Sequence, residues 1–509
     1  MIYFHWPASI VSIVIGLVLV GPFIYFIYRS GNEYKGIYMF RSDAELHYLA
    51  RMNIGINEWT TGNPFLEDTE KTPSPLLTVS EIFLATPSKI TGISVPNLNL
   101  IYKFLLPTIC SLLVYSLFFR LINSRLWSIA GTIMIMLGSF LFNIPDLAHL
   151  FKWENDYGQF LPFDRPVNPE LSSILFFSYL HALFSFLRDK SNKNIYILTV
   201  LLGLSFYVYF YSFTFFLTLN FVLLLYFLYK KEFLSVKKLV ISTVFGMIIG
   251  SYAIINIYNL YTHPYFSSLS KLGDISYSNA PIVSLAWLIV FGIFVITNII
   301  VKQMPFRGYI ILLLATSFLV TNQQVITGIF LQQGHYHWYF NVPIYAIAVT
   351  FSLFYLLRGK RRFFYKAVAL FICLLSFLQA FLVQSSSYVK AYEQTVIDNK
   401  YASVLDWLRE RPKSVVLAED FLSALIPVYT KNKIVWEDHA GFYLMSDDRR
   451  SLTNSFVLNN LNNKEYAKRL KIDYIVLDQK RVEIYNLQGN NFLKEVYKDD
   501  TFVIYAFKD

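Results

Sequence analysis

The chain has 509 residues, of which 55% are hydrophobic and only 15% are charged. Soluble domains carry about 25% charged residues, so this composition excludes an ordinary soluble enzyme. The formal net charge of +10 comes from bases in short loops between apolar runs, which argues against a nucleic-acid partner. The two cysteines, Cys110 and Cys373, lie in separate apolar runs and indicate buried thiols, neither a disulfide nor a metal pair.

Long apolar runs recur along the chain, and a helix needs roughly 20 residues to cross the hydrocarbon core. We therefore predict a polytopic α-helical membrane protein with eleven transmembrane helices. The first run has no basic segment or cleavage site and is expected to be retained as a span. The run 195–229 is too long for one helix, so we divide it at the sequence YSFTF. The predicted spans are 8–28, 98–119, 126–144, 171–187, 195–211, 213–229, 239–258, 282–301, 308–321, 341–357 and 364–385.

Basic residues are distributed unequally between the two sets of loops. Alternate short connections carry 16 Lys and Arg, whereas the opposite loops 145–170, 259–281 and 322–340 carry only three. Basic loops stay in the cytoplasm, so we expect a multi-pass plasma-membrane protein with a cytoplasmic N-terminus. With eleven spans the tail lies outside the cytoplasm.

The composition changes after Gln384. YASVLDWLRE is typical of an amphipathic helix, and KSVVLAE, NKIVWED and DYIVLD are typical of short buried strands. FLKEVYKDDTFVIYAF predicts a hairpin that turns at Asp499 and Asp500. We predict two domains, a transmembrane module over 1–385 with an outer loop at 29–97, and an extracytoplasmic α/β domain over 386–509.

An acidic pair follows the first span in the sequence SDAE. Ser42 and Glu45 fit a capping box that begins a helix at Asp43 and ends it near Glu58, and this local role accounts for both acids. A carboxylate held there could also act as a general base or help to bind a divalent cation, Mg²⁺ or Mn²⁺. Both interpretations stay open from these residues.

The other candidate polar residues map to the same predicted face. Asp164 and Arg165 stand in LPFDRPVNPE, before a span, where a guanidinium can hold a phosphate through two hydrogen bonds or anchor the span to headgroups. His335 and His337 in GHYHWYF diverge if the segment is helical and share a face if it is extended. They could bind substrate or a metal, or belong to an interfacial aromatic belt.

With these residues placed, the chain resembles the GT-C superfamily of membrane glycosyltransferases. The resemblance rests on a first span followed by an outer loop that begins with SDAE and continues with NPFLEDTEKTPSP. It also rests on FDRPVNPE before a span and on a C-terminal α/β domain. It covers nearly the whole chain in architecture, although its motifs are short.

The resemblance implies an inverting transferase of the cell envelope. Members move a sugar from a polyprenyl-phosphate-linked donor to a glycan, lipid or protein acceptor on the extracytoplasmic face. Asp43 would then be the catalytic base, Glu45 would support it or bind a metal, and Arg165 would stabilise the departing phosphate. Asp164, His335 and His337 would line the same site.

Two rival functions remain. A transporter or flippase for a lipid-linked glycan needs ionisable residues in mid-span, and Lys103 and His181 are the notable ones here. A non-catalytic relative that scaffolds a glycan-assembly complex is the second rival, and composition does not separate it from an enzyme.

Overall fold

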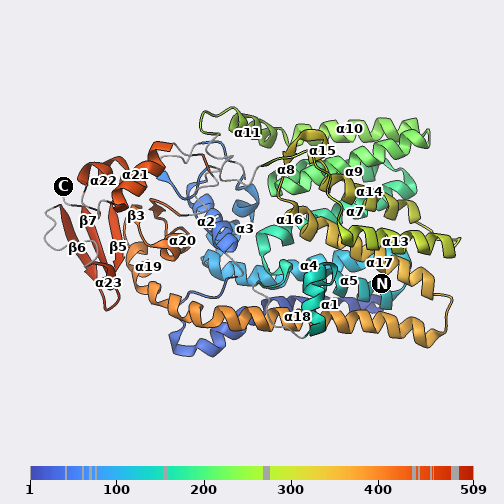
Figure 1. The fold of residues 1–509 in the computed structure, drawn as a ribbon, viewed down its shortest axis with the longest axis horizontal. Coiled ribbons are helices and arrows are strands. Elements are labelled where there is room, and N and C mark those ends of the chain that lie inside the picture. The colour runs from blue at the N-terminus through green and yellow to red at the C-terminus, as the bar shows by residue number, and fades with distance from the viewer. Residues whose placement is uncertain are drawn as a thin grey trace. The chain divides into compact units, whose positions relative to one another are not determined.

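The structure is a computed structural model that describes residues 2–40, 43–59, 62–67, 72–74, 77–152, 159–266, 276–437, 443–444, 447–458, 461, 463–482 and 492–507. The chain forms two compact units (Figure 1). Unit 1 comprises Met1–Tyr25, Leu100–Ile254 and Ile275–Ala391, and unit 2 comprises Phe26–Asn99, Ile255–Asp274 and Tyr392–Asp509. Because each unit combines separate stretches of chain, the predicted division at residue 385 stays a prediction.

Apolar helices dominate unit 1. Its long elements are α1 (Ile2–Ser30), α4 (Val95–Ile122), α5 (Arg125–Leu137), α7 (Ser172–Asp189), α8 (Asn192–Val208), α9 (Phe210–Tyr229), α10 (Phe233–Ile249), α11 (Ser251–Tyr261), α13 (Leu285–Ile300), α14 (Arg307–Thr321), α17 (Val342–Leu357) and α18 (Arg362–Asp398). Short helices α6 (Ile144–Lys152), α15 (Gln324–Thr327) and α16 (Gln333–Tyr336) and the paired strands β1 (Ser276–Tyr277) and β2 (Ile329–Phe330) connect them. Helices α1, α4, α11 and α18 continue into unit 2.

The chain is a polytopic helical membrane protein. Each of the eleven predicted spans overlaps an apolar helix. Within the described residues, however, six helices are long and apolar enough to cross a bilayer, and the bent pair α10 and α11 makes a seventh. The count of eleven is therefore not confirmed, because α5, α13 and α14 are shorter apolar helices. The run 195–229 is divided as predicted, but the break lies at Tyr209, whose φ of −161° and ψ of 131° are extended. The sequence YSFTF, where the break was expected, lies inside α9.

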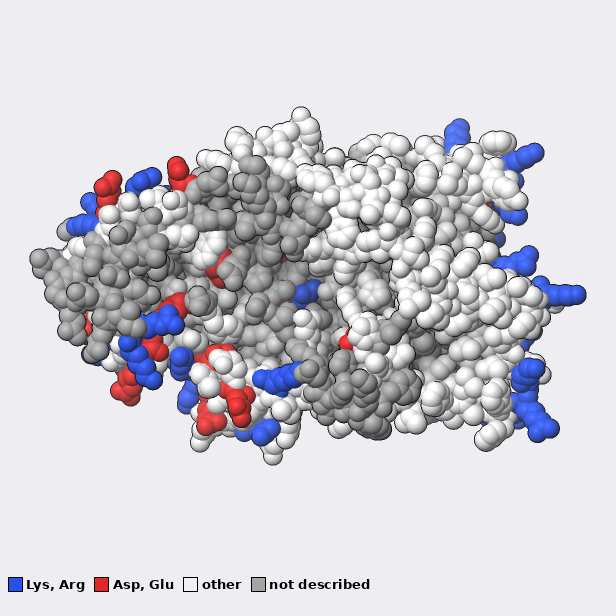
Figure 2. Space-filling model, in the orientation of Figure 1, with Lys and Arg blue, Asp and Glu red and all other residues white. Residues whose placement is uncertain are grey.

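Close helix packing in unit 1 depends on residues without bulk. Gly131 on α5 faces Phe118 on α4, and a Cβ added to the glycine would lie 2.5 Å from the phenyl ring. Figure 2 shows Lys and Arg side chains gathered at one end of unit 1, beyond the ends of α10 and α13. These are the basic connections on which the predicted orientation depends.

Unit 2 contains a five-stranded mixed sheet in the order β4-β3-β5-β7-β6. Strands β3 (Val415–Leu417), β4 (Lys433–Ile434) and β5 (Tyr474–Asp478) are parallel, whereas β6 (Leu493–Lys498) and β7 (Phe502–Phe507) are antiparallel. The helices are α2 (Asp43–Glu58), α3 (Val79–Thr91), α19 (Ala402–Arg409), α20 (Asp420–Tyr429), α21 (Asp447–Leu458), α22 (Lys464–Arg469) and α23 (Gln479–Val482). The predicted strands, hairpin and amphipathic helix of the tail are confirmed.

Two connections bind the outer-loop residues of unit 2 to the tail. The Asn399 side chain accepts hydrogen bonds from the backbone N–H of Lys35 at 2.7 Å and of Ile37 at 3.2 Å, and it donates one to the Ile37 carbonyl. The Ile434 N–H donates to the Phe65 carbonyl at 2.9 Å. A single amide and one backbone bond thereby fix residues that lie more than 300 positions apart.

Candidate functional site

A proline-rich segment before α7 carries most of the buried charge of unit 1. It consists of the 3-10 helix η4 (Pro162–Asp164), Arg165 and the π-helix η5 (Pro166–Leu171). Proline has no N–H and a fixed φ, so this sequence interrupts the regular helical hydrogen bonds and leaves backbone carbonyls for side chains to use. Asp164 and Glu170 are fully buried, and Arg165 is 5% exposed.

Two cations meet at this segment. The Nζ of Lys103, which comes from α4 and is fully buried, donates to the carbonyl of Asp164 at 2.6 Å and lies 4.0 Å from the centroid of the Phe23 ring. Arg165, the next residue, donates from Nε to the Asn168 carbonyl and from Nη2 to the Tyr339 hydroxyl at 3.0 Å. We call Lys103 and Arg165 the buried cation pair. Lys103 and Arg165 thus donate to backbone carbonyls and a tyrosine hydroxyl, in a segment that also contains the buried carboxyl groups of Asp164 and Glu170.

Aromatic residues close around Arg165. The Tyr209 hydroxyl, at the break between α8 and α9, hydrogen-bonds to Nδ1 of His335. The imidazole stacks on Tyr211 with the ring centroids 4.6 Å apart and the planes 5° apart. Tyr339 lies next to it, 5.7 Å from the His335 ring. The structure therefore brings Asp164 and Arg165 together with His335 from a distant part of the sequence.

His337 does not join this group. The segment is helical, with α16 followed by the π-helix η6 (His337–Asn341), so two residues spaced i and i+2 point in different directions. The His337 ring packs against Trp338 and, at 6.4 Å, against Tyr345. The helical alternative foreseen from the sequence is the one observed, and it separates the two histidines.

The acidic pair belongs to unit 2. Helix α2 begins at Asp43 and ends at Glu58, as the capping box predicts, although Ser42 and the Asp43 side chain lie outside the described residues. Glu45 is 1% exposed, and its Oε1 accepts a hydrogen bond from Asn99 at 2.7 Å. Asn99 also donates to the Tyr38 hydroxyl. Burial, and then the negative charge of Glu45, raise the pKa of Tyr38 well above its usual value, so Tyr38 stays a neutral donor.

Further along α2, a buried ion pair joins the helix to α3. Arg51, 1% exposed, donates from Nε to Glu81 at 2.7 Å, from Nη1 to the Tyr443 hydroxyl at 2.8 Å and from Nη2 to the Leu77 carbonyl at 2.7 Å. Burial lowers the pKa of Arg51, but the charge and hydrogen bonds of Glu81 and Tyr443 together outweigh burial and raise the pKa. This network is structural because its charges are satisfied internally.

No three His, Cys, Asp or Glu side chains are grouped as metal ligands in the part of the chain that the structure describes. Glu45 has an amide donor on one oxygen, and the other half of the expected pair, Asp43, has no described side chain. The dependence of this site on Mg²⁺ or Mn²⁺ therefore stays a prediction.

Sequence reasoning identified Arg165 and His335 but assigned no role to Lys103, Glu170 or Tyr339. A lysine inside an apolar run is itself a signal, because a charge in a span is costly and usually functional. Glu170 follows a proline and precedes the span, so it resembled a loop acid. Nothing in the sequence distinguished Tyr339 from the other aromatic residues of HYHWYF.

The fold of this chain is similar to that of solved membrane-protein structures. No protein-family model matches the chain, and no curated protein matches it. Among solved structures, the chain is similar to ArnT from Cupriavidus metallidurans bound to undecaprenyl phosphate, with a TM-score of 0.52 and 10% identity over 99% of this chain and 98% of ArnT. The apo state of ArnT gives a TM-score of 0.50 and 10% identity, over 92% of this chain and 93% of that one. At 10% identity these comparisons show that the chain shares the fold of ArnT over almost its whole length.

Proposed function

We propose that the chain is an inverting glycosyltransferase that moves a sugar from a polyprenyl-phosphate-linked donor to a glycan, lipid or protein acceptor on the extracytoplasmic face of the plasma membrane. The observation that carries the proposal is the buried cation pair, held at the Asp164–Arg165 peptide. The ArnT structure with undecaprenyl phosphate supports it, because its fold is shared along almost the whole chain.

Sugar transfer from such a donor breaks the bond between the anomeric carbon and the phosphate oxygen. The negative charge that develops on the leaving phosphate is stabilised by fixed cations that need no reorganisation. Arg165 offers a planar guanidinium and Lys103 a compact ammonium. Tyr339 and Asn168 fix the direction of the guanidinium. His335, held by Tyr209 and Tyr211, would line the sugar side of the phosphate.

The acceptor hydroxyl must lose a proton as it attacks the opposite face of the anomeric carbon. We assign that proton to Asp43, which begins α2, and a supporting role to Glu45, which Asn99 holds in place.

The experiment measures how much the phosphate group contributes to lipid binding. Full-length protein in detergent is titrated with undecaprenyl phosphate and, separately, with undecaprenol, and bound lipid is counted by native mass spectrometry. Arg165→Gln and Lys103→Met should each weaken binding of the phosphate lipid by tenfold or more, since hydrogen bonds to charged groups are worth about 1.5–3 kcal/mol, and leave undecaprenol binding unchanged. The matched control is Arg120→Gln, which removes another hydrogen-bonded cation of α4.

Equal loss of both lipids in the Arg165 variant would assign Arg165 to structure and remove the main support for the proposal. A transporter is separated by a second readout. In proteoliposomes loaded with labelled donor lipid and acceptor, transfer yields a labelled acceptor and free polyprenyl phosphate. A flippase moves the donor across the bilayer and leaves it intact.

A further inference from the structure

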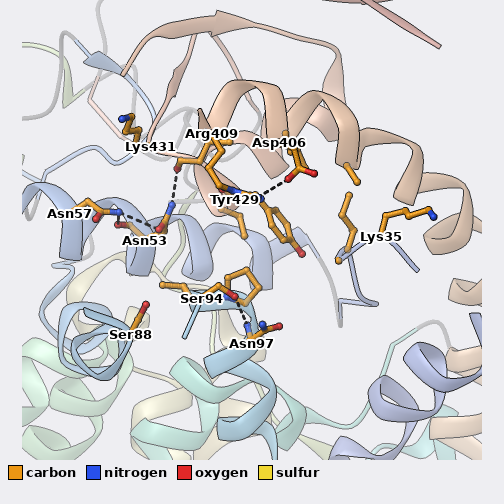
Figure 3. A pocket seen from close by; sticks show the side chains of 18 of the residues that line it. Lys35, Asn53, Asn57, Ser88, Ser94, Asn97, Asp406, Arg409, Tyr429 and Lys431 are labelled. Carbon is orange, nitrogen blue, oxygen red and sulfur yellow. Dashed lines mark hydrogen bonds and ion pairs between the residues drawn. The ribbon is translucent and has the colours of Figure 1, made fainter. Parts of the chain in front are cut away.

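Unit 2 contains a pocket of about 810 Å³ (Figure 3), within the range of about 300–1,000 Å³ that is usual for small-molecule sites. Its walls come from three stretches of chain: residues 34–37 after α1, residues of α2 to α4, and residues 402–431 of the tail. Tyr34 directly follows the candidate span His5–Glu33, and Val95 begins the span Val95–Ile122. The pocket therefore opens within a few residues of a membrane boundary.

Positive charge predominates in this pocket. Four cations line it, Lys35, Lys89, Arg409 and Lys431, against one acid, Asp406. Arg409 Nη1 lies 2.6 Å from the Asp406 carboxylate, so that pair largely offsets itself. The three lysines have no carboxylate within ion-pair distance among the residues described. An anion that enters the pocket meets a net excess of positive charge.

Neutral polar groups form the rest of the lining. Asn53, Asn57 and Asn97 present amides, and Ser88 and Ser94 present hydroxyls (Figure 3). Amides and hydroxyls both donate and accept, which suits a ligand with many hydroxyl groups. The rings of Tyr34 and Tyr429 add flat apolar faces of the kind that cover sugar C–H groups.

The polar lining is also held in place before any ligand arrives. Asn53 Nδ2 donates to the carbonyls of Pro427 at 3.0 Å and Thr430 at 2.7 Å. Arg409 Nε donates to the Tyr429 carbonyl at 3.2 Å. These bonds tie α2 to α20 and α19 to the end of α20, so the two sides of the pocket are connected. Groups fixed in this way lose little freedom on binding.

We propose that this pocket binds an anionic glycan, a hydroxyl-rich chain that carries carboxylate or phosphate groups, and that this glycan is the acceptor. The acceptor role depends on the proposed sugar transfer, whereas the binding does not. An anionic lipid headgroup offers the same charge, but the three asparagines and two serines match a ligand rich in hydroxyl groups.

The test is a calorimetric titration of the detergent-solubilised, full-length protein with tetragalacturonate, and with maltotetraose as the neutral tetrasaccharide of equal length. The triple variant Lys35→Gln, Lys89→Gln, Lys431→Gln should weaken tetragalacturonate binding on the order of tenfold, because each exposed charge contact is worth about 0.2–1 kcal/mol. Higher salt should weaken wild-type binding in the same direction.

The matched control variant is Lys468→Gln, Lys494→Gln, Lys498→Gln, which removes three exposed lysines of unit 2 outside this pocket and should leave the affinity unchanged. Equal binding of the neutral and acidic tetrasaccharides would overturn the proposal. So would binding to phosphatidylglycerol vesicles, against phosphatidylcholine, with no response to tetragalacturonate.

The two proposals fail separately. Arg165→Gln protein should bind tetragalacturonate with wild-type affinity, because Arg165 is not part of the pocket. Tetragalacturonate binding that follows the lysines, in a protein that never transfers sugar, would support the pocket and reject the transferase. If the triple lysine variant transfers sugar with an unchanged KM for the acceptor, the pocket is rejected as the acceptor site.

Discussion

The buried ion pair between Arg51 and Glu81 can be compared with an exposed ion pair of nearly equal N–O distance. Its N–O distance is 2.7 Å with side-chain exposures of 1% and 2%, whereas Arg409 and Asp406 lie 2.6 Å apart with exposures of 53% and 64%. The two pairs have nearly the same length and differ in access to water. Only the buried pair is shielded from solvent screening.

We expect Arg51→Met to destabilise unit 2 by about 3–5 kcal/mol, since removing one partner leaves the other charge buried and uncompensated. In this variant Glu81 keeps one hydrogen bond, from Ser80 at 2.6 Å. Arg409→Gln breaks an exposed pair and should cost about 0–1 kcal/mol. At about tenfold per 1.4 kcal/mol, the first change should speed amide exchange in α2 and α3 by about a hundredfold to a few thousandfold.

The assay is hydrogen–deuterium exchange followed by mass spectrometry on peptides from α2, α3 and α19, with wild type and both variants measured at one pH and temperature. The comparison reports local opening, so global unfolding in detergent need not be reversible. In Arg51→Met, exchange in α2 and α3 should rise more than exchange in α19 rises in Arg409→Gln. An equal or smaller rise would refute the assignment of this network to stability.

Three further predictions concern packing, pH and catalysis. Gly131→Ala should sharply lower the yield of folded protein in size-exclusion chromatography, because the added Cβ would collide with the Phe118 ring. Adding Phe118→Leu to this variant should partly restore the yield. The control Gly292→Ala should leave the yield unchanged, because nothing lies within 4 Å of the added Cβ. Asp499 is destabilised as an anion by burial, but hydrogen bonds from the Phe502 N–H, Ser403, the Thr501 N–H and Tyr497 lower its pKa. The stability that the Asp499 carboxylate gives to the β6–β7 hairpin is therefore present above the unfolded pKa of about 3.9 and is lost as pH falls below that value. Asp499→Asn should speed hydrogen exchange of the hairpin amides at pH 7 and match wild type at low pH. Asp43→Asn should abolish sugar transfer to the acceptor while undecaprenyl phosphate binding persists, and full activity would remove the base assignment.

Local patterns predicted the fold where neighbouring residues decide the structure. The S-x-x-E pattern predicted the start of α2 at Asp43, and the strands of the tail followed from short β-branched runs. Span counting was weaker, because α5, α13 and α14 are apolar but short, and hydropathy does not show how a helix ends. A break in the run 195–229 was foreseen from its length, but it was expected at YSFTF and lies at Tyr209. The hydrogen bond between Tyr209 and His335 is a tertiary contact that the local sequence does not show.

The candidate site was predicted in part. Arg165 and His335 were recognisable as polar residues beside spans, and the structure places them together. Lys103 was visible as a charge in an apolar run, but its hydrogen bond to the Asp164 carbonyl comes from tertiary packing that no local pattern encodes. The pocket of unit 2 lay beyond sequence reasoning altogether, since Lys431 is more than 300 residues from Lys35 and Lys89 and each resembles an ordinary surface lysine.

The distance along the chain between partners in unit 2 has a consequence for biosynthesis. Arg51 and Tyr443 are 392 positions apart, and Ile37 and Asn399 are 362 apart. During translation, α2 emerges long before its companions exist, with a guanidinium and a carboxylate destined for a dry interior still in water. Contacts of such long range form slowly. In a growing chain they cannot form until Asn399 and Tyr443, in the last quarter of the sequence, have been synthesised.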